Sequence, residues 1–204
     1  WVLMSPAHQP AKTAMKNYLI QRYTTIGNLS AAWGKEWKSW EEFLNDCTSV
    51  NSVDASHKGA FESDCKAFNL QIIDQYFRTV RTEFKRVAPD KLYLGCRFAG
   101  SNEVVLRIAA KYCDVISYNI YSKGLDQFRL PTGLDKPVMV GEFHFGALDR
   151  GLFHPGLVEC SNQSDRAQAY IKYVRSALMH PNFIGTHWHQ YSDQATTGRF
   201  DGEN

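Results

Sequence analysis

Residues 137–143 read PVMVGEF, an apolar run of strand length that contains a single carboxylate, Glu142, near its end. Three more short runs of this kind occur, at residues 91–98 (KLYLGCRF), 114–121 (DVISYNIY) and 182–190 (NFIGTHWHQ). Runs that are almost continuously apolar predict strands covered on both faces, as in a parallel sheet. We therefore expect an α/β fold.

Two amphipathic segments alternate with these strands. Residues 101–112 and 162–179 are predicted helices, and Ser101 is the expected cap of the first. The resulting order β-α-β-β-α-β indicates parallel βα units. It fits the last four strands of a (β/α)8 barrel, and an open doubly wound sheet is the alternative. No G-x-G-x-x-G follows any strand, so a nucleotide-binding sheet has no support.

Helices are also predicted throughout residues 1–90. We expect them over residues 6–24, before Gly34, from Trp40, and over 55–87, where Pro89 ends the longest. An apolar stripe is expected along that long helix, formed by Phe61, Cys65, Phe68, Ile72, Tyr76, Val80, Phe84 and Val87.

The length of the chain limits how much of a barrel it can form. A complete (β/α)8 barrel needs about 250 residues. The 204 residues are therefore expected to form the C-terminal half of one, about strands 5–8 in residues 91–204, preceded by the helical segment 1–90. We expect a single catalytic domain, truncated at both ends.

Composition excludes several classes of protein. The net charge is +2, with 44% hydrophobic and 22% charged residues, and neither a basic block nor a run of 18 apolar residues occurs. We therefore expect neither a nucleic-acid partner nor a membrane span. Five cysteines without a C-x-x-C pair indicate neither a disulfide framework nor a zinc ribbon. Cys96 and Cys113 are expected to be buried, and no cofactor is expected.

Glu142 is the first candidate for catalysis. Barrel enzymes carry their working groups at the C-terminal ends of strands. A carboxylate there either forms a structural ion pair, with Arg97 as the expected partner, or points into the barrel mouth as glycoside hydrolysis requires. Polar and aromatic residues end the other strands too, which favours a sugar site, although Trp188 alone suits the core better.

Two long motifs resemble one enzyme family. Residues 141–157 (GEFHFGALDRGLFHPGL) and 185–204 (GTHWHQYSDQATTGRFDGEN) are similar to the β-agarases of glycoside hydrolase family 50. Residues 93–100 and 111–121 support the likeness, and the segment around Trp33 also resembles family 42 β-galactosidases. The resemblance implies retaining cleavage of β-1,4 linkages in agarose to neoagaro-oligosaccharides. It also implies a secreted or periplasmic protein, although no signal peptide is visible in this sequence.

The resemblance also implies residue roles. Glu142 corresponds to the nucleophile at the end of strand seven, with Tyr121 and Arg97 as candidate donors to it. The acid/base of the family is the Glu of an Asn-Glu pair after strand four, which Asn102-Glu103, at the start of a helix, does not match. We therefore expect the acid upstream of Trp1, and no activity from the chain alone. The proposed sugar contacts are Arg97, Asn119, Tyr121, His144, His154, His187, Trp188, Gln190, Asp193 and Arg199.

Other interpretations stay open. His189 stands where the family usually has an aromatic residue, which puts one sugar contact in doubt. His187-x-His189 with Glu142-x-His144 could bind a metal, but metallohydrolase barrels usually carry His-x-His on the first strand, so no metal is expected. A β-galactosidase-like hydrolase of another galactan and a non-catalytic carbohydrate-binding fragment are the remaining alternatives.

Overall fold

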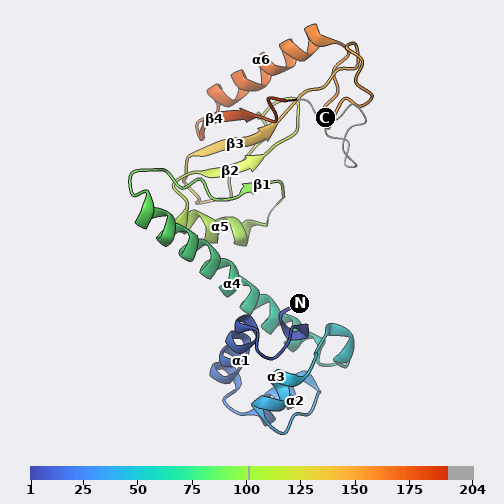
Figure 1. Ribbon diagram of the computed structural model, residues 1–204, viewed down its shortest axis with the longest axis vertical. Coiled ribbons are helices and arrows are strands. Elements are labelled where there is room, and N and C mark those ends of the chain that lie inside the picture. The colour runs from blue at the N-terminus through green and yellow to red at the C-terminus, as the bar shows by residue number, and fades with distance from the viewer. Residues whose placement is uncertain (101, 193–204) are drawn as a thin grey trace. The chain divides into compact units, whose positions relative to one another are not determined.

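The computed structural model describes residues 1–100 and 102–192 and divides into two compact units, Trp1–Ile73 and Asp74–Asn204. The first is helical and the second contains the sheet (Figure 1). Helix α4 (Lys58–Val87) starts in the first unit and ends in the second. In residues 1–100 and 102–192, no helix is both long and apolar enough to cross a membrane.

The first unit consists of α1 (Pro10–Tyr23), α2 (Ile26–Trp33), α3 (Trp40–Asn45), two short 3-10 turns, η1 (Val2–Met4) and η2 (Val50–Ser52), and the start of α4. Thr25 and Ser39 cap α2 and α3 by accepting from backbone N–H groups. Gly34 ends α2 in the left-handed region, as the sequence predicted, with φ 62°.

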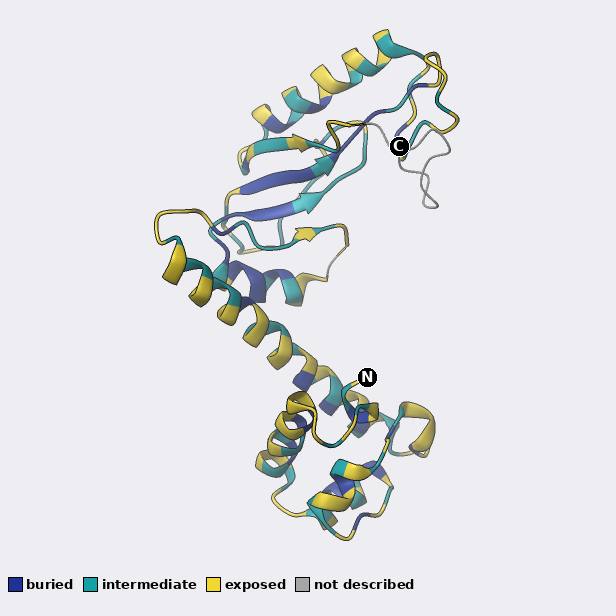
Figure 2. Ribbon diagram, viewed as in Figure 1, coloured by how far each residue is buried: buried dark blue, intermediate teal, exposed yellow. Residues whose placement is uncertain are grey.

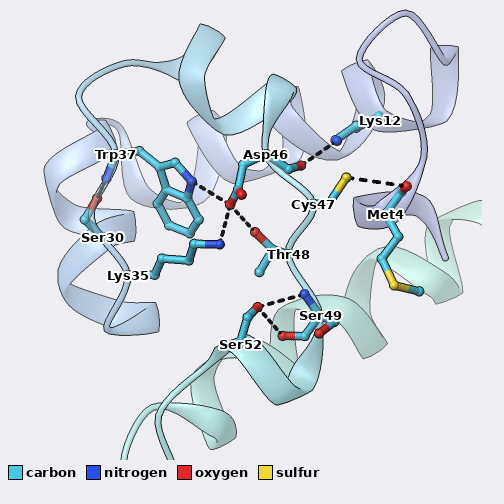
Figure 3. Close-up of polar contacts among 10 residues, drawn as sticks. All are labelled: Met4, Lys12, Ser30, Lys35, Trp37, Asp46, Cys47, Thr48, Ser49 and Ser52. Atoms are coloured by element: carbon cyan, nitrogen blue, oxygen red, sulfur yellow. Dashed lines mark hydrogen bonds and ion pairs between the residues drawn. The ribbon is translucent and has the colours of Figure 1, made fainter.

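Buried rings and a partly buried carboxylate stabilise this unit. Trp33 is fully buried and meets Phe61 edge-on, with ring centroids 4.8 Å apart. Asp46 accepts hydrogen bonds from Trp37 at 3.0 Å and Thr48 at 2.8 Å and pairs with Lys35 at 2.5 Å (Figure 3). These donors lower the pKa of Asp46 against the opposing effect of its burial.

In the second unit a parallel sheet has its strands in chain order: β1 (Arg97–Phe98), β2 (Ile116–Asn119), β3 (Val138–Phe143) and β4 (Phe183–Trp188). Helix α5 (Glu103–Tyr112) connects β1 to β2, and α6 (Gln163–Met179) connects β3 to β4 (Figure 1). The predicted α/β class and order of elements are confirmed.

Three details of the second unit differ from expectation. The expected first strand, residues 91–98, is reduced to Arg97–Phe98, because Gly95 has φ 67° and packs against Cys113. Asn102 caps α5, and the expected cap Ser101 lies outside the described residues. Cys113 is buried as expected, but Cys96 is only partly buried.

The stripe expected along α4 is wrong in its second half. Phe61 and Phe68 are buried, but Ile72, Tyr76 and Val87 are exposed, and Phe77 is buried instead. The reason is that α4 contributes to two cores: its start packs in the first unit, whereas Phe77 packs on Phe98 of the second.

Both connecting helices cover the same face of the sheet. Ile116 of β2 is paired with Val138 of β3, so the two side chains share a face. Ile116 packs with α5, and Val138 packs with Tyr173 and Ala177 of α6. The central strands are the most buried part of the sheet (Figure 2). The other face carries Arg97, Ser117 and Met139, which are aligned across β1, β2 and β3.

Candidate active site

A β-bulge decides where Glu142 points. Side chains alternate along a strand, so Glu142 would follow Val138 and Val140 onto the α6 face if β3 were regular. However, Tyr118 of β2 pairs with Val140, and the next residue, Asn119, pairs with Glu142. Gly141 and Glu142 of β3 thus lie opposite the single residue Asn119 of β2. This is a β-bulge, and a bulge redirects the side chains that follow it.

The bulge separates Glu142 from its neighbour Phe143. Phe143 turns to α6 and stacks on Tyr173, with ring centroids 4.3 Å apart and planes 6° from parallel. Glu142 then lies in register with Asn119 on the face of the sheet that carries Arg97, Ser117 and Met139. We call this the open face. The hydroxyl of Tyr173 donates to the carbonyl of Ile120 at 2.7 Å, which fixes the end of β2 beside the site.

Two side chains bind the Glu142 carboxylate, the expected donors Tyr121 and Arg97, and the ion pair with Arg97 is also the one expected if Glu142 had a structural role. Tyr121 donates to Oε2 at 2.8 Å, and Nη2 of Arg97 lies 3.1 Å from Oε1. The Glu142 side chain is 14% exposed and that of Arg97 is 54% exposed, so the carboxylate is sheltered but reachable. Tyr121 and Arg97 thus hold one oxygen each and fix the orientation of the carboxylate.

Asn119 lies beside this carboxylate with part of its amide unused. Its Oδ1 is buried, and no donor in the described residues reaches it. Buried polar atoms normally have a partner, so Oδ1 is an acceptor that the described residues leave unused. The sugar contact expected at Asn119 stays a prediction.

His144, one of the expected sugar contacts, is buried. It is 4% exposed, its Nδ1 lies 3.2 Å from the carbonyl oxygen of His189, and Nε2 accepts from Leu157 N–H at 2.8 Å. Because Nε2 accepts, Nδ1 carries the proton. His144 therefore ties the loop after β3 to the end of β4.

His187 and Trp188 point to opposite faces of β4. Trp188 pairs with Phe143 and packs edge-on against it at 5.3 Å between centroids, with the Arg166 guanidinium 5.3 Å from its own centroid. Thr186 pairs with Val140 on the same α6 face, so His187, between Thr186 and Trp188, lies on the Glu142 face and is exposed.

The remaining expected contacts are less defined. His154 is exposed in the loop after β3, and Gln190 is exposed while its carbonyl accepts from Trp188 at 3.0 Å. Asp193 and Arg199 lie outside the described residues. The sequence reasoning missed Gly141 and the bulge. A glycine inside a strand, just before its only charge, was the signal that could have revealed both.

The chain was compared with known families and proteins. No family model matches it. The β-agarase B of Vibrio sp. (strain JT0107) is 41% identical over 205 residues, which cover 96% of this chain. The structure of an exo-β-agarase matches the whole chain with TM-score 0.82 and 38% identity, and PfGH50B does so with TM-score 0.81 and 37% identity. The resemblance to the β-agarases of family 50 is confirmed.

The match is to a part of these family 50 proteins. The chain spans 21% of β-agarase B, 28% of the exo-β-agarase chain and 29% of PfGH50B. Its whole length aligns at TM-scores above 0.8 with both solved structures, so the sheet, its two helices and the helical unit all have counterparts there.

Proposed function

We propose that this chain belongs to a retaining glycoside hydrolase that cleaves β-1,4 linkages of agarose to neoagaro-oligosaccharides, with Glu142 as nucleophile. The observation that carries the proposal is the position of Glu142: a bulge turns it to the open face of the sheet, where Tyr121 and Arg97 bind it. The similarity to β-agarase B and to an exo-β-agarase supports the choice of substrate.

The reaction assigns separate tasks to two carboxyl groups about 5–5.5 Å apart. Glu142 attacks the anomeric carbon while the bond to the leaving oxygen breaks, and that oxygen takes a proton from the second carboxyl group. The product of this step is a glycosyl ester on Glu142. The second group, now a carboxylate, removes a proton from water, which attacks the anomeric carbon and releases Glu142.

We place the second carboxyl group in the part of the enzyme that this chain does not span. The Asn102-Glu103 pair does not supply this group. Glu103 forms an ion pair with Arg107 at 2.5 Å on the surface of α5, and Asn102 caps that helix. The chain alone is then inactive, since general acid catalysis contributes about 10²–10⁴-fold.

We further propose that β1–β4 are strands 5–8 of a (β/α)8 barrel within one catalytic domain, with residues 1–90 as a helical segment after strand 4. Strands in chain order with every connecting helix on one face support a barrel, because a doubly wound sheet has helices on both faces. Exposed apolar residues on α6 and β4, Ile171, Leu178, Met179 and Ile184, are suited to packing against the rest of such a barrel. We also propose that the enzyme is secreted or periplasmic, since it must reach a polymeric substrate.

The test is the Glu142→Ala variant of the complete enzyme, assayed for reducing ends on agarose. We expect complete loss of hydrolysis with the fold intact, and partial recovery with azide or formate, which occupy the vacated position as small nucleophiles. Glu103→Ala, which removes an exposed carboxylate of the same sheet unit, should stay active. Activity of Glu142→Ala within a few-fold of wild type would exclude the assignment. Activity on β-galactosides but not on agarose would favour the galactosidase-like alternative.

A further inference from the structure

We propose that Gly141 is a positioning residue for the nucleophile: the absence of a side chain there leaves the space through which Arg97 reaches Glu142. The inference rests on the proposed role of Glu142. It concerns a residue that contacts no substrate in this scheme and acts only through Arg97.

Arg97 has to cross a strand to reach its partner. It stands in β1, pairs with Ser117 of β2, and Ser117 pairs with Met139 of β3. Neighbouring strands lie about 4.8 Å apart, so the guanidinium must extend over β2 to meet a residue of β3. At its end, Nη1 donates to the Gly141 carbonyl at 3.3 Å and Nη2 reaches Glu142.

Where it passes over β2, the Arg97 side chain occupies the space that a side chain at position 141 would need. A Cβ on Gly141 would lie 2.7 Å from both Cγ and Cδ of Arg97 and 2.5 Å from Oγ of Ser117. Carbon atoms pack at about 3.5–4.0 Å, so a methyl group and the present Arg97 conformation cannot coexist.

Space, rather than backbone conformation, explains the glycine. Gly34, Gly95, Gly133, Gly151 and Gly156 have positive φ, whereas Gly141 does not. Alanine is therefore compatible with the backbone of β3, and the strain of Gly141→Ala falls on the Arg97 side chain and on the hydroxyl of Ser117. Since the Arg97 side chain is half exposed, it can turn into solvent and leave Glu142 with Tyr121 alone.

A double-mutant cycle in the complete enzyme tests this step. Gly141→Ala and Arg97→Ala should each lower kcat about tenfold, the lower end of the loss of a charged hydrogen bond, with a smaller change in KM. The double variant should be no slower than Arg97→Ala, because both changes remove one interaction. Losses that multiply in the double variant, or a wild-type kcat for Gly141→Ala, would overturn the proposal.

A matched control comes from the neighbouring strand. Gly185 of β4 pairs with Met139 on the same face, and a Cβ there meets nothing within 4 Å in the described residues. Gly185→Ala should keep kcat and KM. An equal loss in Gly185→Ala would show that any methyl group on this face is harmful, and would refute a specific role for Gly141.

Two further measurements separate this inference from folding and from the proposed function. If Gly141→Ala does not fold, adding Arg97→Ala and Ser117→Ala together should restore folding, since these changes remove Cγ, Cδ and Oγ; a triple variant that stays unfolded overturns the inference. A crystal structure of Gly141→Ala shows the position of the Arg97 side chain independently of any activity assay, and we expect Arg97 to have turned away from Glu142. Arg97 still hydrogen-bonded to Glu142 would refute the inference, whereas an active Glu142→Ala would refute only the proposed function.

Discussion

Tyr121 meets the imidazole of His144 edge-on, with ring centroids 4.9 Å apart. Its hydroxyl binds Glu142, and His144 binds the backbone at Leu157 and His189. One aromatic residue thus links the candidate nucleophile to the loop after β3 and to the end of β4. The orientation of the Glu142 carboxylate therefore depends in part on the backbone contacts of His144.

Tyr121→Phe should lower kcat of the complete enzyme by about tenfold or more, because it removes one hydrogen bond to the charged Glu142 and leaves the ring in place. Stability should change little. The control is Tyr112→Phe, which removes a bond of the same kind, from Tyr112 to Asp74 at 2.7 Å, away from the site. Equal kcat values for the two variants would contradict a role for Tyr121 at the nucleophile.

His144→Ala should destabilise the protein by roughly 2–3 kcal/mol, because it leaves the Leu157 N–H and the His189 carbonyl without their buried partner. The loop of residues 145–157 should then exchange amide hydrogens faster, as measured by mass spectrometry. Phe153→Ala removes an exposed side chain of the same loop and should leave exchange unchanged. Unchanged exchange in His144→Ala would show that the two bonds do not hold the loop.

Much of this site follows from the sequence, and the exceptions have physical causes. Glu142, Arg97 and Tyr121 were predictable together because the ends of parallel strands meet at one edge of the sheet. The face on which each side chain lies was not predictable, since one bulge in β3 reverses it.

The burial of the residues at the strand ends was likewise not predictable from the sequence. His144 and His187 look alike in the sequence, yet one is buried by its backbone partners and the other is exposed. For α4, periodicity predicted the helix but not the change of core along it, because an apolar stripe does not record which unit each turn packs in.

Trp188→Ala and His187→Ala should affect different properties, since they lie on opposite faces of β4. Trp188→Ala removes packing against Phe143 and Tyr170 and should cost roughly 3 kcal/mol of stability. His187→Ala should leave the thermal midpoint unchanged and weaken binding of neoagaro-oligosaccharides. Calorimetry of unfolding and of binding measures the two effects, and a destabilised His187→Ala with normal binding would contradict this assignment of faces.

Asp114 gives the second unit a pH-dependent part of its stability. Its carboxylate accepts from Tyr93 N–H at 2.8 Å and pairs with Arg81 at 2.9 Å and Lys85 at 3.1 Å. The backbone hydrogen bond from Tyr93, followed by the two cations, holds the pKa of Asp114 well below its usual range despite the opposing effect of burial. A depressed folded-state pKa means that the carboxylate stabilises the fold above the unfolded pKa of about 3.9, and that this stabilisation is lost as the pH falls below it.

Asp114→Asn should therefore lower the free energy of unfolding at pH 7 by about 1.5 kcal/mol, the lower end for hydrogen bonds to a charged group. The difference from wild type should shrink as the pH is lowered from about 4 to 2, because the carboxyl group takes up a proton in the unfolded state while it is still ionised in the folded state. Urea titrations at a series of pH values measure this. Asp90→Asn, a change at an exposed carboxylate of the same unit, is the control. A difference that stays constant from pH 7 to pH 2 would show that Asp114 stabilises the sheet as a hydrogen-bond acceptor, which an amide nitrogen cannot replace, rather than through its charge.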